Sequence, residues 1–124
     1  MKKILFVLMI LLLGVILVAC DNDDSWDYSS PTYQVKYKVG GTTSQASLTY
    51  ENAQGGTEQM DVRVPWEKTI GTVERGDFLY LSAQNQNDSG SITCEIWVDG
   101  NRWKHSISSG AYVIASCNGS AGRE

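Results

Sequence analysis

From Thr32 onward, apolar and polar side chains alternate with a period of two, which is the pattern of strands that bury one face. The clearest run is TYQVKYKV at residues 32–39, where every second side chain is aromatic or branched. Turns rich in glycine separate most of the runs that follow, of which WEKTIGTV is the weakest. These other runs lie at residues 45–51, 58–64, 66–73, 78–84, 91–98, 102–108 and 111–117.

No segment after residue 20 shows the 3.6-residue period of a helix, and no internal repeat is present. The spacing of runs and turns predicts one all-β domain at residues 32–124, a two-sheet, immunoglobulin-like β-sandwich of about seven strands. The long cysteine spacing of true immunoglobulin domains is missing, so this likeness concerns architecture alone.

One hairpin can be registered from the sequence. Asp99-Gly100 indicates a two-residue type I′ turn, because both central residues of that turn need a positive φ. Pairing outward from the turn sets Ile96 opposite Trp103, Cys94 opposite His105, and Ile92 opposite Ile107. We therefore expect His105, the only histidine, on the inner face beside Cys94. A structural role is favoured for it, because no nucleophile or further metal ligand accompanies it in the sequence.

The chain begins with a targeting pattern. Lys2 and Lys3 precede an apolar stretch at residues 4–19, which is shorter than the roughly 20 residues of a membrane-spanning helix. Residues 17–20, LVAC, resemble a bacterial lipobox, in which cleavage precedes the cysteine and lipid is attached to it. We expect a helical signal peptide at residues 1–19 and lipidation of Cys20, with the domain on the extracytoplasmic side of the cell membrane. An uncleaved, slightly tilted membrane helix is the alternative.

Residues 20–31 form an acidic, turn-rich segment that is typical of a tether. Loss of Lys2 and Lys3 with the signal peptide lowers the formal net charge from −4 to −6. An acidic domain lacks the basic surface that binds nucleic acid or anionic lipid headgroups. The membrane is therefore expected as a partner only through the lipid on Cys20, and nucleic acid is not expected.

Cys94 and Cys117 remain as an even pair, and export places them where disulfides persist. A bridge closing a loop of about 24 residues contributes roughly 3 kcal/mol. If residues 111–117 paired next to residues 102–108, Cys117 would lie about 9.5 Å from the Cys94 strand, beyond the roughly 7 Å limit of a disulfide. The last strand must therefore cross to the facing sheet or join the other side of the Cys94 strand.

Catalytic and metal-binding patterns are missing, so we expect neither an enzyme nor a cofactor. Asn85, Asn87 and Asp88 offer oxygen ligands, but without the calcium-loop spacing they indicate a solvated hairpin loop. Trp97 should point outward, either as a binding residue or covered by a loop or the tether. Trp66 either plugs the edge of the core or belongs to a binding rim, and Tyr112 is the third candidate binding residue.

The segments TEQMDVRVPWEKTI, FLYLSAQNQNDSGSITCEIWVDG and SSGAYVIASCNG, taken in this order, resemble the soluble domain of the MmpS (mycobacterial membrane protein small) family over about residues 35–119. The resemblance implies an extracytoplasmic β-sandwich with a Cys94–Cys117 disulfide. It also implies an accessory role beside proton-driven exporters of the resistance-nodulation-division type, which move lipids and siderophores. Family members usually keep an uncleaved N-terminal helix, so coupling through such a helix is not expected here.

Two functions are expected from these observations. The first is a non-enzymatic lipoprotein whose domain binds a transporter or another envelope protein. The second is a carrier that holds a lipid or small amphiphile between its sheets. The aromatic residues expected to line such a cavity are Tyr33, Tyr37, Tyr50 and Trp103.

Overall fold

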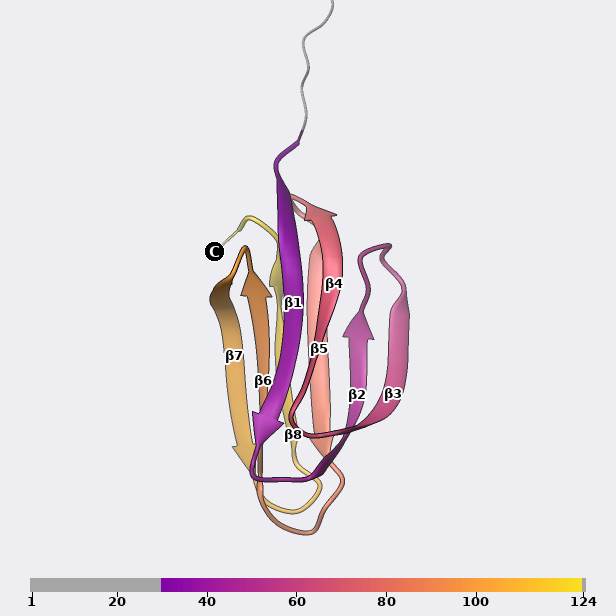
Figure 1. The fold of residues 1–124 in the computed structure, drawn as a ribbon, viewed down its shortest axis with the longest axis vertical. Coiled ribbons are helices and arrows are strands. Elements are labelled where there is room, and N and C mark those ends of the chain that lie inside the picture. Colours follow the sequence, from indigo (N-terminus) through magenta and orange to yellow (C-terminus); the bar gives the residue numbers. More distant parts are fainter. Residues whose placement is uncertain (1–29, 124) are drawn as a thin grey trace, which may run out of the picture.

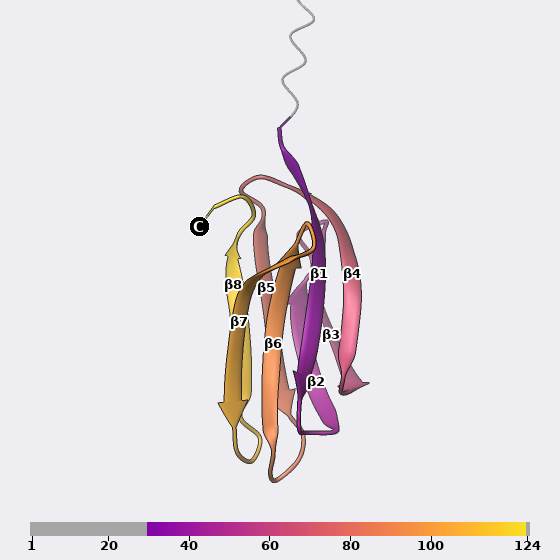
Figure 2. The same cartoon turned by 60° about the vertical axis from the view of Figure 1, so that its left-hand side comes forward.

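A computed structural model describes residues 30–123, and the expected signal peptide, Cys20 and most of the expected tether lie outside these residues. Two four-stranded antiparallel sheets pack face to face along the long axis of the molecule (Figures 1 and 2). The strands are β1 (Thr32–Gly41), β2 (Gln45–Glu51), β3 (Thr57–Arg63), β4 (Trp66–Glu74), β5 (Phe78–Asn85), β6 (Ser91–Val98), β7 (Asn101–Ser109) and β8 (Ile114–Ser120).

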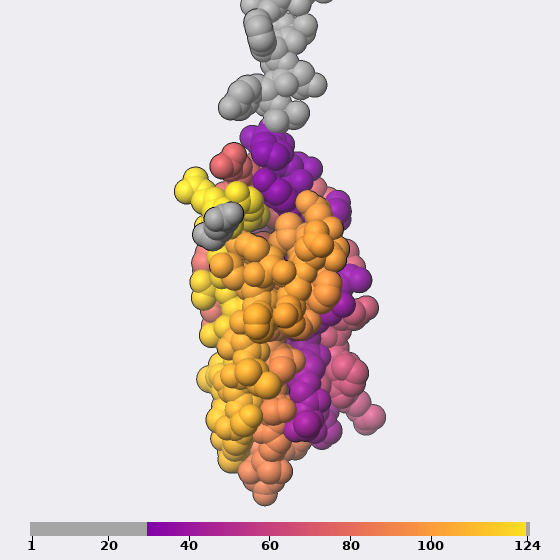
Figure 3. Space-filling view, turned by 90° about the vertical axis from the view of Figure 1, so that its left-hand side faces the viewer, coloured from indigo at the N-terminus to yellow at the C-terminus, as the bar shows by residue number. Residues whose placement is uncertain are grey.

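The first sheet has the strand order β4-β1-β6-β7, and the second has the order β3-β2-β5-β8. The predicted all-β sandwich is confirmed, with eight strands in place of about seven, because the weak run WEKTIGTV forms the edge strand β4. The edge strands β7 and β8 lie side by side on one narrow face of the molecule (Figure 3).

The interior is filled by the apolar half of each alternating strand. Tyr37 and Tyr50 meet across it edge to face, with ring centroids 5.8 Å apart. Their contact joins β1 of the first sheet to β2 of the second. The buried core consists of Val35, Tyr37, Val39, Ala46, Leu48, Tyr50, Val73, Leu79, Leu81, Ala83, Ile92, Cys94, Ile96, Ala115, Cys117 and Ala121.

The hairpin between β6 and β7 confirms the predicted turn and corrects the predicted register. Asp99 and Gly100 have φ values of 50° and 80°, as a type I′ turn requires. After Trp97 pairs with Arg102, the register shifts by one residue. Ile96 then pairs with Lys104, Cys94 with Ser106, and Ile92 with Ser108.

The cause of the shift is a bulge at Trp103, whose indole packs against Gly119 of β8. One extra residue moves every later side chain to the opposite face of the sheet. The expected pairings of Ile96 with Trp103, Cys94 with His105, and Ile92 with Ile107 are therefore wrong. His105 lies opposite Glu95 and is exposed, and Ile107 is 65% exposed.

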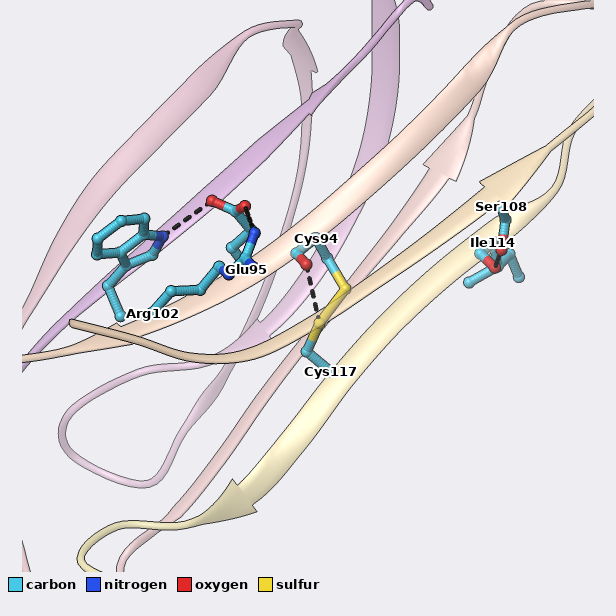
Figure 4. Close-up of a disulfide and its surroundings, with 7 residues drawn as sticks. Cys94, Glu95, Arg102, Ser108, Ile114 and Cys117 are labelled. Atoms are coloured by element: carbon cyan, nitrogen blue, oxygen red, sulfur yellow. Dashed lines mark hydrogen bonds and ion pairs between the residues drawn. A yellow bond between two sulfur atoms is a disulfide. The ribbon is translucent and has the colours of Figure 1, made fainter. Parts of the chain in front are cut away.

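The two cysteines join the sheets through the interior (Figure 4). Cys94 lies on β6 of the first sheet, and Cys117 lies on β8, which pairs with β5 in the second. Their Cα atoms are 6.3 Å apart, and the sulfurs form a disulfide. Of the two positions allowed for the last strand, the crossing to the facing sheet is the one observed.

Tyr37 gives the domain an expected sensitivity to alkali. Burial raises the pKa of its hydroxyl above the ordinary value of 10.0, and the hydroxyl donates a hydrogen bond to the Glu51 carbonyl at 2.9 Å. Above pH 10 the unfolded chain loses this proton while the folded chain keeps it. The free energy of unfolding should therefore fall by up to about 1.4 kcal/mol per pH unit.

Urea unfolding of the wild type and Tyr37→Phe between pH 7 and 11 measures this effect. The variant should lose about 1 kcal/mol at pH 7 with its hydrogen bond, and its stability should decline less steeply above pH 10. Equal slopes for the two proteins would assign the alkaline decline to other groups.

Candidate functional site

An open groove of about 440 Å³ lies where β1, β6 and the start of β4 meet. Its position follows from register, since Lys38 pairs with Glu67 on one side and with Glu95 on the other, and Gly40 pairs with Thr93. The alternate residues of β1 are buried in the core, so these side chains occupy the outer face of the first sheet. The lining residues are Lys38, Val39, Gly40, Pro65, Trp66, Glu67, Thr93 and Glu95.

Trp97 lies beside this groove, on the outer face as predicted. The Nζ atom of Lys38 lies 4.1 Å from the centroid of its ring, and its Nε1 donates a hydrogen bond to Glu95 at 2.9 Å. The other carboxylate oxygen of Glu95 is 3.4 Å from Arg102 (Figure 4). Trp97 thus holds two groove residues, Lys38 and Glu95, in position. Among the described residues, a lysine side chain rather than a loop covers its ring.

The charges around the groove are paired loosely. Glu67 lies 4.0 Å from Lys36 and 3.9 Å from Lys38, and all three side chains are at least one-third exposed. Exposed ion pairs contribute about 0–1 kcal/mol, and an exposed cation–π contact contributes about 0.5–1 kcal/mol. Lys38 can therefore leave the indole face of Trp97 at small cost when another group approaches.

Trp66 plugs the edge of the core and also lines the groove. Its ring lies 5.8 Å from that of Tyr50, at the edge of the core, and the residue also lines the groove. On the neighbouring surface, Lys68 donates a hydrogen bond to the Tyr50 hydroxyl at 3.3 Å. This hydrogen bond raises the pKa of Lys68. The wall of the groove is therefore anchored to the core through Trp66 and Tyr50.

Tyr112 is separate from this groove. It lies in the turn between β7 and β8 with a φ of 57°, and it is 56% exposed. Its backbone amide donates to the carbonyl of Asn87, and its carbonyl accepts from Gln84. The structure thus places Trp66 in the wall of the groove, Trp97 beside the groove, and Tyr112 elsewhere.

Asn85 has a role that the sequence analysis missed. Its side chain is fully buried, and its Nδ2 donates to the carbonyls of Ser89 and Gly110, each at 2.9 Å. Its Oδ1 accepts from the hydroxyl of Thr43 and from the amide of Asn87. The expectation of a solvated loop is therefore wrong for Asn85, which ties three loops together. The sequence does indicate this position, because Asn85 follows Leu79, Leu81 and Ala83 at the same two-residue spacing and so falls on the buried face of β5.

Within residues 30–123, no three His, Cys, Asp or Glu side chains cluster closely enough to hold a metal ion. Over the same residues, no helix has the length and apolarity needed to cross a membrane.

The family described as Mycobacterium membrane protein matches residues 4–121. The chain belongs to this family. It is the MmpS family that the segments around Trp66, Cys94 and Cys117 resemble. The match extends from the N-terminal apolar stretch through β8, and it identifies the chain as a membrane-associated protein of this family. No curated relative matches the chain.

Proposed function

We propose that this protein is a lipid-anchored, non-enzymatic adaptor on the extracytoplasmic side of the cell membrane. Its domain binds a partner protein through the groove and the face of Trp97. The family suggests that this partner is an exporter of the resistance-nodulation-division type. The observation that carries the proposal is Trp97, an outward tryptophan covered by one partly exposed lysine and adjoining an open groove.

The chemistry of this surface suits binding to protein. Tryptophan is enriched among the residues that dominate interface energies, and its flat ring gives a large contact area. A partner carboxylate can draw Lys38 away from the ring, since the lysine is held only by exposed contacts. The freed indole then adds apolar area beside the groove, whose wall includes Trp66 and whose charged lining residues include Glu67 and Glu95.

The proposed anchor is the lipid on Cys20. The lipobox-like residues 17–20, LVAC, support this anchor. Two or more acyl chains on one residue give stable attachment, and the acidic segment at residues 20–31 would separate the domain from the membrane. The mass of the mature chain tests the anchor, with an acylated N-terminal Cys20 expected.

The packing of the interior favours surface binding over carriage of a lipid between the sheets. Tyr37 and Tyr50 contact each other, Tyr33 packs against Gly122, and Trp103 packs against Gly119. These aromatic residues, which were expected to line a cavity, contact other parts of the protein. A lipid would have to displace them.

Crosslinking of native membranes, followed by purification of the full chain and mass spectrometry, tests the proposed function. Trp97→Ala should reduce recovery of the transporter partner by about thirtyfold, as loss of a hot spot of 2 kcal/mol does. Phe78→Ala is the matched control, because Phe78 is an aromatic residue 53% exposed on the other sheet.

Urea unfolding of both variants separates lost binding from lost folding. Equal recovery of the partner with wild type and Trp97→Ala would contradict binding through the groove and the face of Trp97. Recovery of neither a transporter nor another envelope protein would remove the adaptor function itself.

A further inference from the structure

One side of the sandwich is formed by a long uncharged stretch of chain. Residues 106–122, SISSGAYVIASCNGSAG, contain no Asp, Glu, Lys, Arg or His. They form the end of β7 and all of β8, which are edge strands of the two sheets. Figure 3 shows this side, with β7 in orange and β8 in yellow.

The opposite edges differ in charge. Proteins commonly place charged residues on edge strands, because charge prevents another strand from pairing there. Strands β3 and β4 follow this rule, and β8 does not. The charged residues of β3 and β4 are Glu58, Asp61, Arg63, Glu67, Lys68 and Glu74.

The backbone of β8 has a free side. The amide of Asn85 donates to the carbonyl of Val113, so by alternation Ala115 and Cys117 direct their backbone groups toward β5. The residues between them, Ile114 and Ser116, and Asn118 beyond, direct theirs away. In the part of the chain that the structure describes, no strand pairs with this side of β8. The carbonyl of Ile114 accepts from the Ser108 hydroxyl at 2.7 Å (Figure 4).

Apolar side chains adjoin this free edge. Five large hydrophobic residues are exposed in the described part of the chain, and three of them belong to the uncharged stretch. Ile107, Tyr112 and Ile114 are 65%, 56% and 54% exposed. Ile114 lies on β8 itself, beside the free edge, whereas Ile107 points from the outer face of the first sheet.

We propose that the free edge of β8 binds an extended, uncharged segment of the partner protein. This segment pairs with β8 and so extends the second sheet by one strand. This inference rests on the proposed function and adds to it the chemistry of the bound segment. Main-chain hydrogen bonds to Ile114, Ser116 and Asn118 provide affinity, and contact with the exposed side chain of Ile114 favours an apolar side chain in the added segment.

A second copy of the chain fits this edge less well. Antiparallel pairing of β8 with its own copy inverts one of the two molecules. The chain enters the domain at one end, through β1 (Figure 1), so the two tethers would leave from opposite ends. The inverted tether would then run back about 33 Å, the length of a ten-residue strand, and this would use most of the roughly 43 Å that twelve fully extended residues span, at a large cost in conformational entropy. Anchoring in one membrane therefore disfavours self-pairing.

Hydrogen–deuterium exchange of the full chain in detergent micelles tests the proposal. The probe is an acetylated and amidated peptide of alternating threonine and valine, eight residues long. Before it is added, the amides of Ile114, Ser116 and Asn118 should exchange fast, and those of Ala115 and Cys117 slowly. Saturating peptide should slow the first group by about tenfold or more.

Two substitutions at one position separate backbone pairing from side-chain contact. Ser116→Pro removes the outward amide of an exposed edge residue, which a β-sheet edge tolerates, and it should abolish protection by the peptide. Ser116→Ala keeps the amide and should preserve protection. A peptide in which lysine replaces valine should protect less.

Three results would overturn the proposal. One is absence of protection in the wild type with millimolar peptide, and another is equal protection in Ser116→Pro and Ser116→Ala. The third is protection of β8 that rises with protein concentration without peptide, which would identify a second copy as the occupant. If β8 fails these tests while Trp97→Ala still reduces partner recovery, the proposed function stands and this edge does not take part.

Discussion

Replacing Asn85 by aspartate should lower the free energy of unfolding by about 4 kcal/mol at pH 7, because it places an uncompensated charge in the interior. The amide Nδ2 of Asn85 donates to two carbonyl oxygens, those of Ser89 and Gly110. A carboxylate would turn both donor contacts into repulsion between oxygens. Urea unfolding at pH 7 measures the loss.

Asn118→Asp is the matched control, since it makes the same chemical change at an exposed position of β8. Its effect should stay within about 0.5 kcal/mol, as for most surface substitutions. A similar loss in both variants would show that added negative charge, and not the buried contacts, destabilises the domain.

The loss in Asn85→Asp should depend on pH. Burial and the facing carbonyl oxygens raise the pKa of the new carboxyl in the folded state. The folded protein then keeps a proton that the unfolded chain loses near its ordinary pKa of about 3.9. Stability is therefore retained below that pH and lost as pH rises, so the difference from wild type should shrink on acidification.

Removal of the disulfide by the double substitution Cys94→Ala and Cys117→Ala should cost about 3 kcal/mol. The bridge spans 23 positions in sequence and joins the two sheets. Its loss frees a loop in the unfolded chain and removes the covalent link that holds the edge strand β8 opposite β6. Urea unfolding with and without a thiol reductant measures the effect.

The reductant should lower the stability of the wild type to that of the double variant and leave the variant unchanged. Unchanged wild-type stability, once mass spectrometry has confirmed that both thiols are free, would contradict this prediction.

The strands and the layers could be predicted because alternation is local. Each strand records in its own residues which side faces the core, and Tyr33, Val35 and Tyr37 do so clearly. The distance limit of a disulfide then supplied one long-range constraint, which left two possible positions for β8: in the facing sheet, or on the other side of the Cys94 strand.

The bulge could not be predicted in the same way. Its cause is the space that Gly119 leaves for the Trp103 ring, and these two residues are 16 positions apart in the sequence. The turn at Asp99-Gly100 fixed the start of the hairpin correctly, but no signal in the turn reports a later extra residue. The outward position of His105 followed from that shift.

The groove could not be predicted from the sequence either, although the outward position of Trp97 and a possible rim at Trp66 were. Alternation placed Trp97 outside, and the Pro65-Trp66 pair suggested a rim. The groove between them depends on β1, which brings Lys38 and Gly40 between β4 and β6. Strand order is set by packing over the whole domain, so no local pattern predicts which strands become neighbours.

The central position of β1 has a mechanical consequence. This strand continues directly from the proposed tether, and it pairs with β4 over eight residues and with β6 over seven. Antiparallel hydrogen bonds run perpendicular to the strand, so a pull along its axis loads both ladders together in shear. A force applied to the domain by a bound partner would therefore have to break the hydrogen bonds of both ladders together before β1 separates from the rest of the domain.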